Sequence, residues 1–197
     1  VEIMKRVFEE RNVHPLMRGL WQPRLERALE WVEHEVAGYG DRKVVAVEAW
    51  GEMHVDGVRI HGKIDRLDRY ADGTLAIVDY KTGAVPAKKD VNAGLSPQLP
   101  LEAAMIVHGA FGDIAPGNVT ALTYWKLSGG DPAGEIRDVG DDPSTLAEQA
   151  LAGLISLLDY YGDPETPYAA RPDPDIAPRH SDFEHLERLQ EWSSARD

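Results

Sequence analysis

The chain has 197 residues, of which 43% are hydrophobic, a length that can bury one substantial core. Its 34 acidic and 21 basic residues give a formal net charge of -13, so this chain alone is expected to bind DNA weakly at physiological salt. It has no cysteine, which excludes disulfides and thiolate metal sites and favours a cytoplasmic location. No apolar run approaches the roughly 18 residues of a membrane helix, so no membrane association is expected.

The first part of the chain is predicted to form two helices followed by three strands. Apolar residues at helical spacing predict helices over residues 2–11 and 23–36. β-rich runs predict strands over residues 43–50 and 59–69. Residues 75–81 are expected to form the third and most buried strand.

The middle of the chain continues the alternation of helices and strands. Residues 82–94 are predicted to be a polar loop of a size that often carries function. A helix is expected over residues 97–107, and strands over 118–126 and 135–139. A long helix is expected over residues 143–160.

The last residues are expected to form a tail on a single domain. Residues 162–179 hold five prolines and are predicted to be an extended loop, before a final helix over 181–192. We therefore divide residues 1–197 into N-terminal helices (1–42), a core (43–161) and a proline-rich tail (162–197). The element order predicts an α/β fold with a mixed sheet flanked by helices.

Two carboxylates and an amine are predicted to meet at one end of a hairpin. Asp79 and Lys81 are two residues apart in a strand, so their side chains lie on one face. If residues 71–73 form a three-residue loop that ends in a left-handed glycine, Asp65 lies opposite Asp79. The same register pairs Tyr70 with Thr74 and Leu67 with Ile77, and brings Lys63 near Lys81. A two-residue Asp-Gly turn would instead shift the register by one residue and turn Asp65 to the other face.

Facing carboxylates suggest a metal site. Two carboxylates about 5 Å apart repel each other unless a cation lies between them. Mg²⁺ suits one or two carboxylates together with waters and phosphate oxygens, and Mn²⁺ is the alternative ion. Lys81 would then orient the attacking water, accept its proton, or offset charge in the transition state. For any one of these residues alone, an edge hairpin with solvated charges is the competing interpretation.

The sequence around these residues resembles a nuclease family. The motifs are Gly-x-Ile-Asp-Arg-x-Asp at 62–68, Val-Asp-Tyr-Lys-Thr-Gly at 78–83 and Pro-Gln-Leu-Pro-Leu at 97–101. In this order and spacing they resemble the RecB-type branch of the PD-(D/E)xK nucleases. Within that branch the resemblance is greatest to the C-terminal nuclease domain of AddB, which belongs to the AddAB helicase-nuclease that resects double-strand breaks. It covers residues 44–110, with a weaker match over 185–193.

The resemblance implies a restriction-endonuclease-like fold and a Mg²⁺-dependent deoxyribonuclease, exonuclease or endonuclease, in double-strand-break repair and recombination. It implies two partners, which are a DNA single strand delivered by a helicase and an AddA-like helicase-nuclease subunit. It assigns the metal to Asp65, Asp79, the Tyr80 main-chain carbonyl and Glu48. It assigns catalytic roles to Asp65, Asp79, Lys81 and Gln98, with Gln98 at the start of a helix, contacting the scissile strand or the metal's water.

The chain departs from the family pattern in four respects. No Gly-x-x-His motif precedes Glu48, and His14 is interpreted as a loop residue, so we expect an excised fragment that has lost the helix with the metal-binding His. Glu102 stands where the family usually has Tyr, one helical turn after Gln98. The absence of cysteine excludes the iron-sulfur cluster of many AddB domains, and the net charge of -13 is unusual for a DNA-binding protein. We expect Arg66 and four lysines, Lys63, Lys81, Lys88 and Lys89, to offset that charge around the site.

Two other functions remain open from the sequence. The first is a catalytically silent nuclease-like module that serves as a structural or DNA-scaffolding part of the same complex. The second is an unrelated acidic α/β binding domain in which the Asp-Tyr-Lys match arises by chance.

Overall fold

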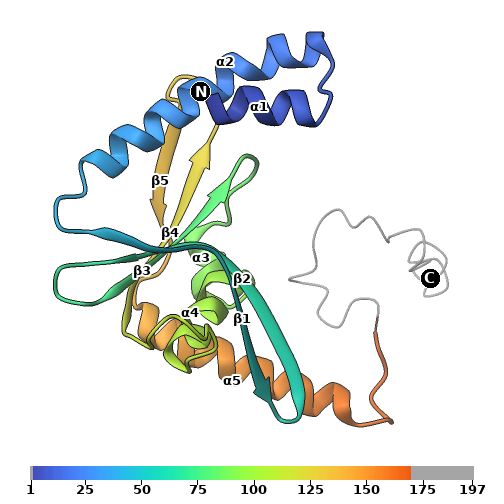
Figure 1. Cartoon of the computed structure of the whole chain (residues 1–197). Coiled ribbons are helices and arrows are strands. Elements are labelled where there is room, and N and C mark those ends of the chain that lie inside the picture. Colours follow the sequence, from blue (N-terminus) through green and yellow to red (C-terminus); the bar gives the residue numbers. More distant parts are fainter. Residues whose placement is uncertain (1, 170–197) are drawn as a thin grey trace, which may run out of the picture. The chain divides into compact units, whose positions relative to one another are not determined.

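A computed structural model gives the structure of the chain, which is described here for residues 2–169. The chain divides into two compact units, residues 1–155 and 156–197, and the sheet lies in the first. Within the described residues the strands form a five-stranded sheet in the order β1-β2-β3-β4-β5 (Figure 1). The strands are β1 (Lys43–Val55), β2 (Val58–Arg69), β3 (Leu75–Lys81), β4 (Val119–Leu127) and β5 (Gly134–Asp138). The sheet is mixed, because β3 and β4 are parallel and the other neighbouring pairs are antiparallel.

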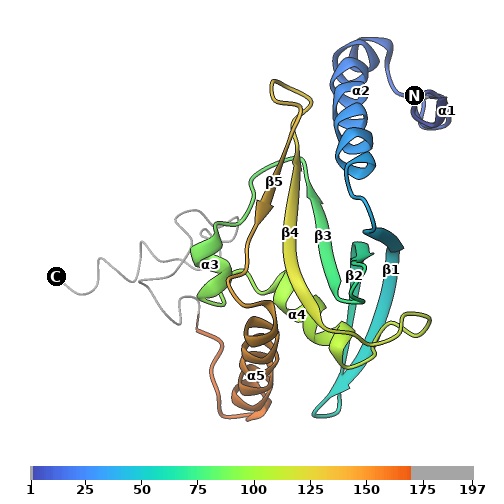
Figure 2. The same ribbon diagram turned by 90° about the vertical axis from the view of Figure 1, so that its left-hand side faces the viewer.

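The helices cover both faces of this sheet. They are α1 (Glu2–Glu10), α2 (Pro15–Ala37), α3 (Lys88–Asn92), α4 (Gln98–Val107) and α5 (Pro143–Gly162). α4 and the first turns of α5 lie on one face, and α2 lies on the other, with α1 beside it (Figures 1 and 2). The α3–α4 segment forms the crossover that a parallel β3–β4 pair requires. The predicted α/β class, a mixed sheet flanked by helices, is confirmed.

β3 is the central strand of the sheet, and both of its faces are covered. Residues 75–78 are fully buried, as expected for a strand that packs against helices on both sides. Leu75 and Ile77 join the main hydrophobic core with α4, in which Leu99 and Ala103 are fully buried. The C-terminal end of β3 then carries the polar residues of the site from this core toward the surface.

The β2–β3 hairpin has the loop that was predicted. The Tyr70 N–H donates to the Thr74 carbonyl at 2.9 Å, and Gly73 has a φ of 88° in the left-handed region. Leu67 pairs with Ile77, and the ladder ends at the Arg66–Val78 pair. The three-residue loop is therefore confirmed, but the ladder ends before the predicted Asp65–Asp79 pair and does not extend to Lys63 and Lys81.

Several element boundaries differ from those predicted. α2 begins at Pro15 and contains Pro23, where the sequence predicted the helix to start. Pro23 can donate no hydrogen bond to the Gly19 carbonyl four residues earlier, yet the helix continues past this position. β1 extends to Val55 because its pairing with β2 continues to the hairpin turn. The expected loop over 82–94 contains the short helix α3.

α5 begins at Pro143, where the Asp142 side chain accepts a hydrogen bond from the Thr145 N–H at 3.2 Å. No helix within residues 2–169 is long and apolar enough to cross a membrane. The predicted helix over 181–192 and most of the proline-rich tail lie outside the described residues.

Candidate active site

The C-terminal end of β3 places Asp79 and Lys81 on the face covered by α4. Both follow Ile77 at intervals of two residues, and Ile77 lies in the core under α4. The Asp79 side chain is 5% exposed, and its Oδ2 lies 2.8 Å from Lys81 Nζ. Asp79 and Lys81 thus share a face, as their spacing predicted, and they form an ion pair at the edge of the core.

Gln98 joins this pair from the first turn of α4. Its Nε2 donates to Asp79 Oδ1 at 2.7 Å, and its Oε1 accepts from Lys81 Nζ at 3.2 Å. Pro97 occupies the N-cap position, so Gln98 is the first residue of the helix and faces the end of β3. The structure therefore brings together three of the residues that were expected to be catalytic.

Asp65 lies where β2 separates from β3. Its Oδ2 accepts a hydrogen bond from the Tyr80 N–H at 2.9 Å, so a side chain replaces the main-chain acceptor beyond the last ladder pair. Ile64 and Leu67 both belong to the core cluster although they are three residues apart. The side-chain alternation of β2 is therefore interrupted between them, and Asp65 takes part in that irregularity.

Two further buried residues, Glu102 of α4 and Tyr124 of β4, lie beside these groups. Glu102 is one helical turn after Gln98 and is 5% exposed, and its Oε1 accepts from Gln98 Nε2 at 3.1 Å. Tyr124 pairs with Asp79 across the parallel β3–β4 ladder, and the Lys81 ammonium lies 5.5 Å from its ring centroid. Glu102 was noted from the sequence as an open question, and Tyr124 was missed because the β3–β4 register is not visible in the sequence.

Burial changes the acidity of both groups. Burial raises the pKa of Glu102 to about 7, and the nearby charges of Asp79 and Asp65 act in the same direction. Burial likewise raises the pKa of Tyr124 to about 12, with further contributions from Asp79 and Glu102.

The opposite face of β3 holds a buried ionic network. Arg66 donates to Asp68 through Nε at 2.7 Å and Nη2 at 2.8 Å, and Arg42 contacts the same carboxylate at 2.8 Å. Arg66 Nη1 also donates to the Tyr80 hydroxyl at 3.1 Å. Asp68 is thus an ion-pair partner of both arginines, and this network contacts Tyr80 from the far side of the sheet.

The remaining expected site features are arranged differently. Glu48 forms an ion pair with Lys63, and its side chain is 63% exposed. Of the five basic residues expected to offset the negative charge around the site, Lys81 lies within it, but Arg66 and Lys88 are paired elsewhere. Arg66 is buried against Asp68 on the other face, and Lys88 pairs with Asp141 at 2.6 Å. His14, expected in a loop, caps α2 by accepting from the Leu16 N–H at 3.3 Å.

The donor atoms of the site suit a hard cation. Glu102 Oε2 is buried and has no hydrogen-bond partner among the described residues, and Asp79 Oδ2 is buried with only its ion pair to Lys81. Carboxylate oxygens are the donors that Mg²⁺ and Mn²⁺ prefer. Residues 2–169 contain no group of three or more His, Cys, Asp or Glu side chains arranged to hold a metal. The residues therefore fit an ion that takes one or two protein carboxylates and completes its shell with water and substrate.

A family comparison agrees with this geometry. The model of the PD-(D/E)XK nuclease superfamily matches residues 1–191. The chain belongs to this superfamily. Membership accounts for the mixed sheet and for the Asp79 and Lys81 pair at the end of its central strand, and the predicted restriction-endonuclease-like fold is confirmed.

Individual superfamily relatives match parts of the chain. An uncharacterized protein of Rickettsia bellii is 33% identical over 132 residues, which are 58% of this chain and 16% of that protein. An uncharacterized protein of Rickettsia conorii is 27% identical over 146 residues, 60% of this chain and 17% of its own. The B subunit of the ATP-dependent helicase/deoxyribonuclease of Streptococcus pyogenes is 41% identical over 103 residues, 49% of this chain and 9% of that relative. The chain therefore spans less than a fifth of each of these relatives, and the likeness to the AddB type is confirmed.

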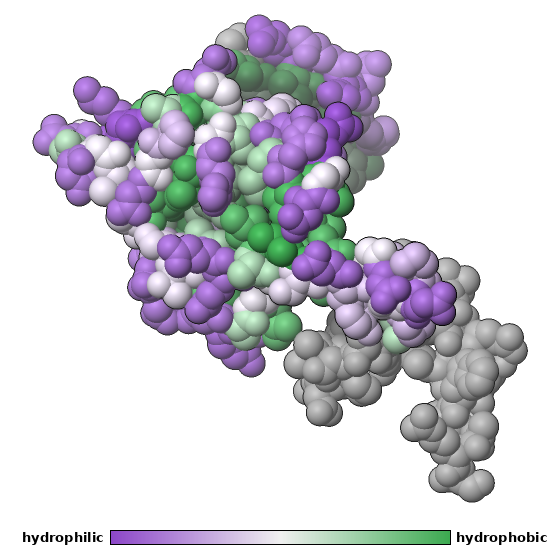
Figure 3. Space-filling model, turned by 90° about the horizontal axis from the view of Figure 1, so that it is seen from below, coloured by the Kyte–Doolittle hydropathy of each residue, from purple (hydrophilic) through white to green (hydrophobic). Residues whose placement is uncertain are grey.

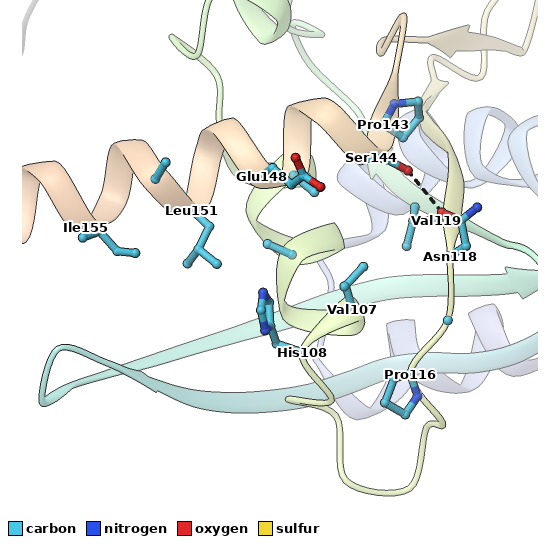
Figure 4. A pocket seen from close by; sticks show the side chains of 14 residues that line it. Val107, His108, Pro116, Asn118, Val119, Pro143, Ser144, Glu148, Leu151 and Ile155 are labelled. Atoms are coloured by element: carbon cyan, nitrogen blue, oxygen red, sulfur yellow. Dashed lines mark hydrogen bonds between the residues drawn. The ribbon is translucent and has the colours of Figure 1, made fainter.

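A separate hollow lies away from these carboxylates. It has a volume of about 660 Å³ and lies between the end of α4, the residues before β4 and α5, with Val107, Leu151 and Ile155 among its lining (Figure 4). The Ser144 hydroxyl donates to Asn118 Oδ1 at 3.1 Å on one wall. Hydrophobic side chains are visible between polar ones on the lower face of the molecule (Figure 3). This hollow contains none of the candidate catalytic residues.

Proposed function

We propose that this chain is a metal-dependent deoxyribonuclease domain that hydrolyses phosphodiester bonds in DNA. The observation that carries the proposal is the contact set among Asp79, Lys81 and Gln98 at the end of β3, in a member of the PD-(D/E)XK superfamily. A carboxylate, an ammonium and an amide at one point supply a cation ligand, a positive charge for phosphate and a polar group for substrate.

Asp79 and Asp65 are the side chains that would hold Mg²⁺ or Mn²⁺, together with the Tyr80 carbonyl, and we keep Glu48 as a further candidate. When bound, the ion supplies Lewis-acid polarisation of the phosphate and a water of lowered pKa. Asp65 is held in place by the Tyr80 N–H, and Asp79 by Gln98. Both carboxylates are therefore oriented before any ion arrives, which favours preorganised binding.

Lys81 supplies the positive charge of the site. Its ammonium lies between the Asp79 carboxylate and the Gln98 carbonyl, and its side chain is 28% exposed. A partly exposed ammonium can reach a phosphate in solution while its partners limit its position. We assign to Lys81 the orientation of the attacking water and the stabilisation of negative charge that develops on the phosphate.

We further propose that the domain acts on single strands delivered by a helicase, in double-strand-break repair and recombination in the cytoplasm. The similarity to the B subunit of an ATP-dependent helicase/deoxyribonuclease supports this role. The net charge of -13 is compatible with this role, since a partner that delivers the strand lessens the need for the domain itself to attract DNA. An AddA-like helicase-nuclease subunit is the partner that this role requires.

The test compares Lys81→Met with Lys89→Met, an exposed lysine of α3. Labelled single-stranded DNA is incubated with each protein and Mg²⁺ or Mn²⁺. We expect Lys81→Met to lower kcat by about 10²–10³-fold, as removal of one electrostatic stabiliser does, while Lys89→Met cleaves like the unmodified protein. Chelation of the metal should abolish cleavage. Equal cleavage by Lys81→Met and the unmodified protein would refute the proposal.

The alternative is a catalytically silent module of the same complex. It is favoured by the lack of a ready group of three ligands within residues 2–169. Titration calorimetry with Mn²⁺ separates the two proposals when it is run beside the cleavage assay. Binding that disappears in Asp79→Asn together with cleavage supports the nuclease, whereas a folded protein that binds no Mn²⁺ and cleaves nothing supports the silent module.

A further inference from the structure

Gln98 has a single favourable orientation of its side-chain amide. Its Nε2 faces two carboxylates, Asp79 Oδ1 at 2.7 Å and Glu102 Oε1 at 3.1 Å. Its Oε1 faces the Lys81 ammonium at 3.2 Å. Turning the amide over would place its oxygen against both carboxylates and its N–H groups against an ammonium. The surrounding charges therefore define the orientation of the amide.

Glu102 is one of the two carboxylates that hold the amide nitrogen of Gln98. The amide nitrogen has two hydrogens, and Asp79 and Glu102 each accept one of them. Without Glu102, one hydrogen of Gln98 would lose its partner. The amide would then be held by Asp79 alone, the residue proposed to bind the cation. Glu102 thus keeps Gln98 in place when Asp79 is engaged by an ion.

We propose that Glu102 is a positioning residue that fixes the Gln98 amide and, through its oxygen, the Lys81 ammonium. The inference rests on the proposed nuclease function for its catalytic consequence, but not for the orientation of the amide. The hydrogen bonds of Glu102 reach no further than Gln98, so the positioning of Lys81 by hydrogen bonds passes through that amide.

The burial of Glu102 argues against a role in stability alone. Glu102 is 5% exposed, and its Oε2 has no hydrogen-bond partner among the described residues. A buried carboxylate with one oxygen unpartnered loses solvation that its single hydrogen bond does not restore. An apolar side chain of similar size would cost less at this position. A group that lowers stability is retained where it serves the site.

The experiment compares Glu102→Met, which removes the acceptor, with Glu102→Gln, which keeps one, and with Glu148→Met as an exposed control. The first readout is the hydrogen exchange of the Gln98 side-chain NH₂, followed by ¹⁵N NMR in metal-free protein and assigned with Gln98→Ala. We expect both hydrogens to be protected in the unmodified protein and in Glu102→Gln. In Glu102→Met one hydrogen should exchange about tenfold faster, the effect of losing one hydrogen bond.

The second readout is cleavage of single-stranded DNA with Mg²⁺. We expect kcat of Glu102→Met to fall about tenfold with KM nearly unchanged, while Glu102→Gln stays within about twofold of the unmodified protein. The urea midpoint of Glu102→Met should not fall. A merely structural role predicts a lower midpoint and no rescue by Gln.

Two results would overturn the proposal. One is a Gln98 NH₂ that exchanges at the rate of a free amide in the unmodified protein, and this measurement needs no variant to fold. The other is equal protection and equal kcat in Glu102→Met and Glu148→Met. If the unmodified protein cleaves no DNA, the nuclease function fails while the NMR comparison still decides the role of Glu102.

Discussion

Replacing Asp68 with Ala should unfold the protein at a much lower concentration of urea. The Asp68 carboxylate is fully buried and contacts both Arg66 and Arg42, through four N–O pairs of 2.7–2.9 Å. The side chains of Arg66 and Arg42 are only 3% and 14% exposed, so neither guanidinium can recover full solvation when its partner is removed. Breaking a buried pair in this way costs about 3–5 kcal/mol.

That loss is large beside the roughly 5–15 kcal/mol that stabilises an ordinary domain. In the unmodified protein, burial lowers the pKa of Arg66, but its hydrogen bonds with Asp68 and Tyr80 outweigh this effect and raise it. Arg66 still stays charged in the variant, because a guanidinium does not lose its proton in proteins. The charge therefore remains in place without its partner, and the variant is destabilised across the whole accessible pH range.

Urea unfolding followed by tryptophan fluorescence measures this loss. Trp125 reports on the region, since it is 1% exposed and the Arg66 guanidinium lies 4.9 Å from its ring centroid. Glu135→Ala is the matched control, because Glu135 pairs with Arg137 at 2.8 Å with both side chains exposed. We expect the midpoint of Asp68→Ala to fall strongly and that of Glu135→Ala to stay nearly unchanged, at similar slopes. Equal midpoints for the two variants would refute the argument from burial.

Three further predictions use the same unfolding assay in metal-free buffer. The unmodified protein should lose stability as pH rises from 4.5, the ordinary pKa of Glu, to about 7, because folded Glu102 holds a proton that the unfolded chain has released. Glu102→Gln should therefore gain stability relative to the unmodified protein, by up to about 3 kcal/mol at pH 8. A constant difference from pH 4 to 8 would contradict this. Gly134→Ala should lose about 1–3 kcal/mol, since its Cβ would lie 2.2 Å from the Trp31 ring, and an unchanged midpoint would disprove that contact. Leu67→Ala, at a fully buried position, should lose about 2–5 kcal/mol, whereas Leu16→Ala, at a position 74% exposed, should change little; similar losses in both would argue against the assigned core.

Much of the β2–β3 hairpin was predictable because its determinants are local. The loop needs one residue in the left-handed region, Gly73 supplies it, and the pairing of Leu67 with Ile77 follows by counting. The shared face of Asp79 and Lys81 follows from the two-residue period of a strand. The placement of Gln98 beside them came from the family resemblance, since no local rule brings the start of α4 to the end of β3.

The rest of the site depends on packing between distant segments. Tyr124 lies beside Asp79 because of the parallel β3–β4 register, which a long crossover sets and no turn specifies. The separation of β2 from β3 at Asp65 is likewise a tertiary feature, and simple continuation of the ladder would have paired Lys63 near Lys81. The extent of α2 was underestimated because Pro23 usually marks a helix start but lies inside this one.

Residues 79–81, at the end of β3, form hydrogen bonds on both faces of the sheet. Asp79 and Lys81 are engaged from the α4 side, while the residue between them, Tyr80, is engaged by Arg66 from the α2 side. A change in the Arg66 network would therefore reach the proposed catalytic pair through Tyr80, the residue between them. Selection for stability and selection for the proposed activity would act here on the same few atoms.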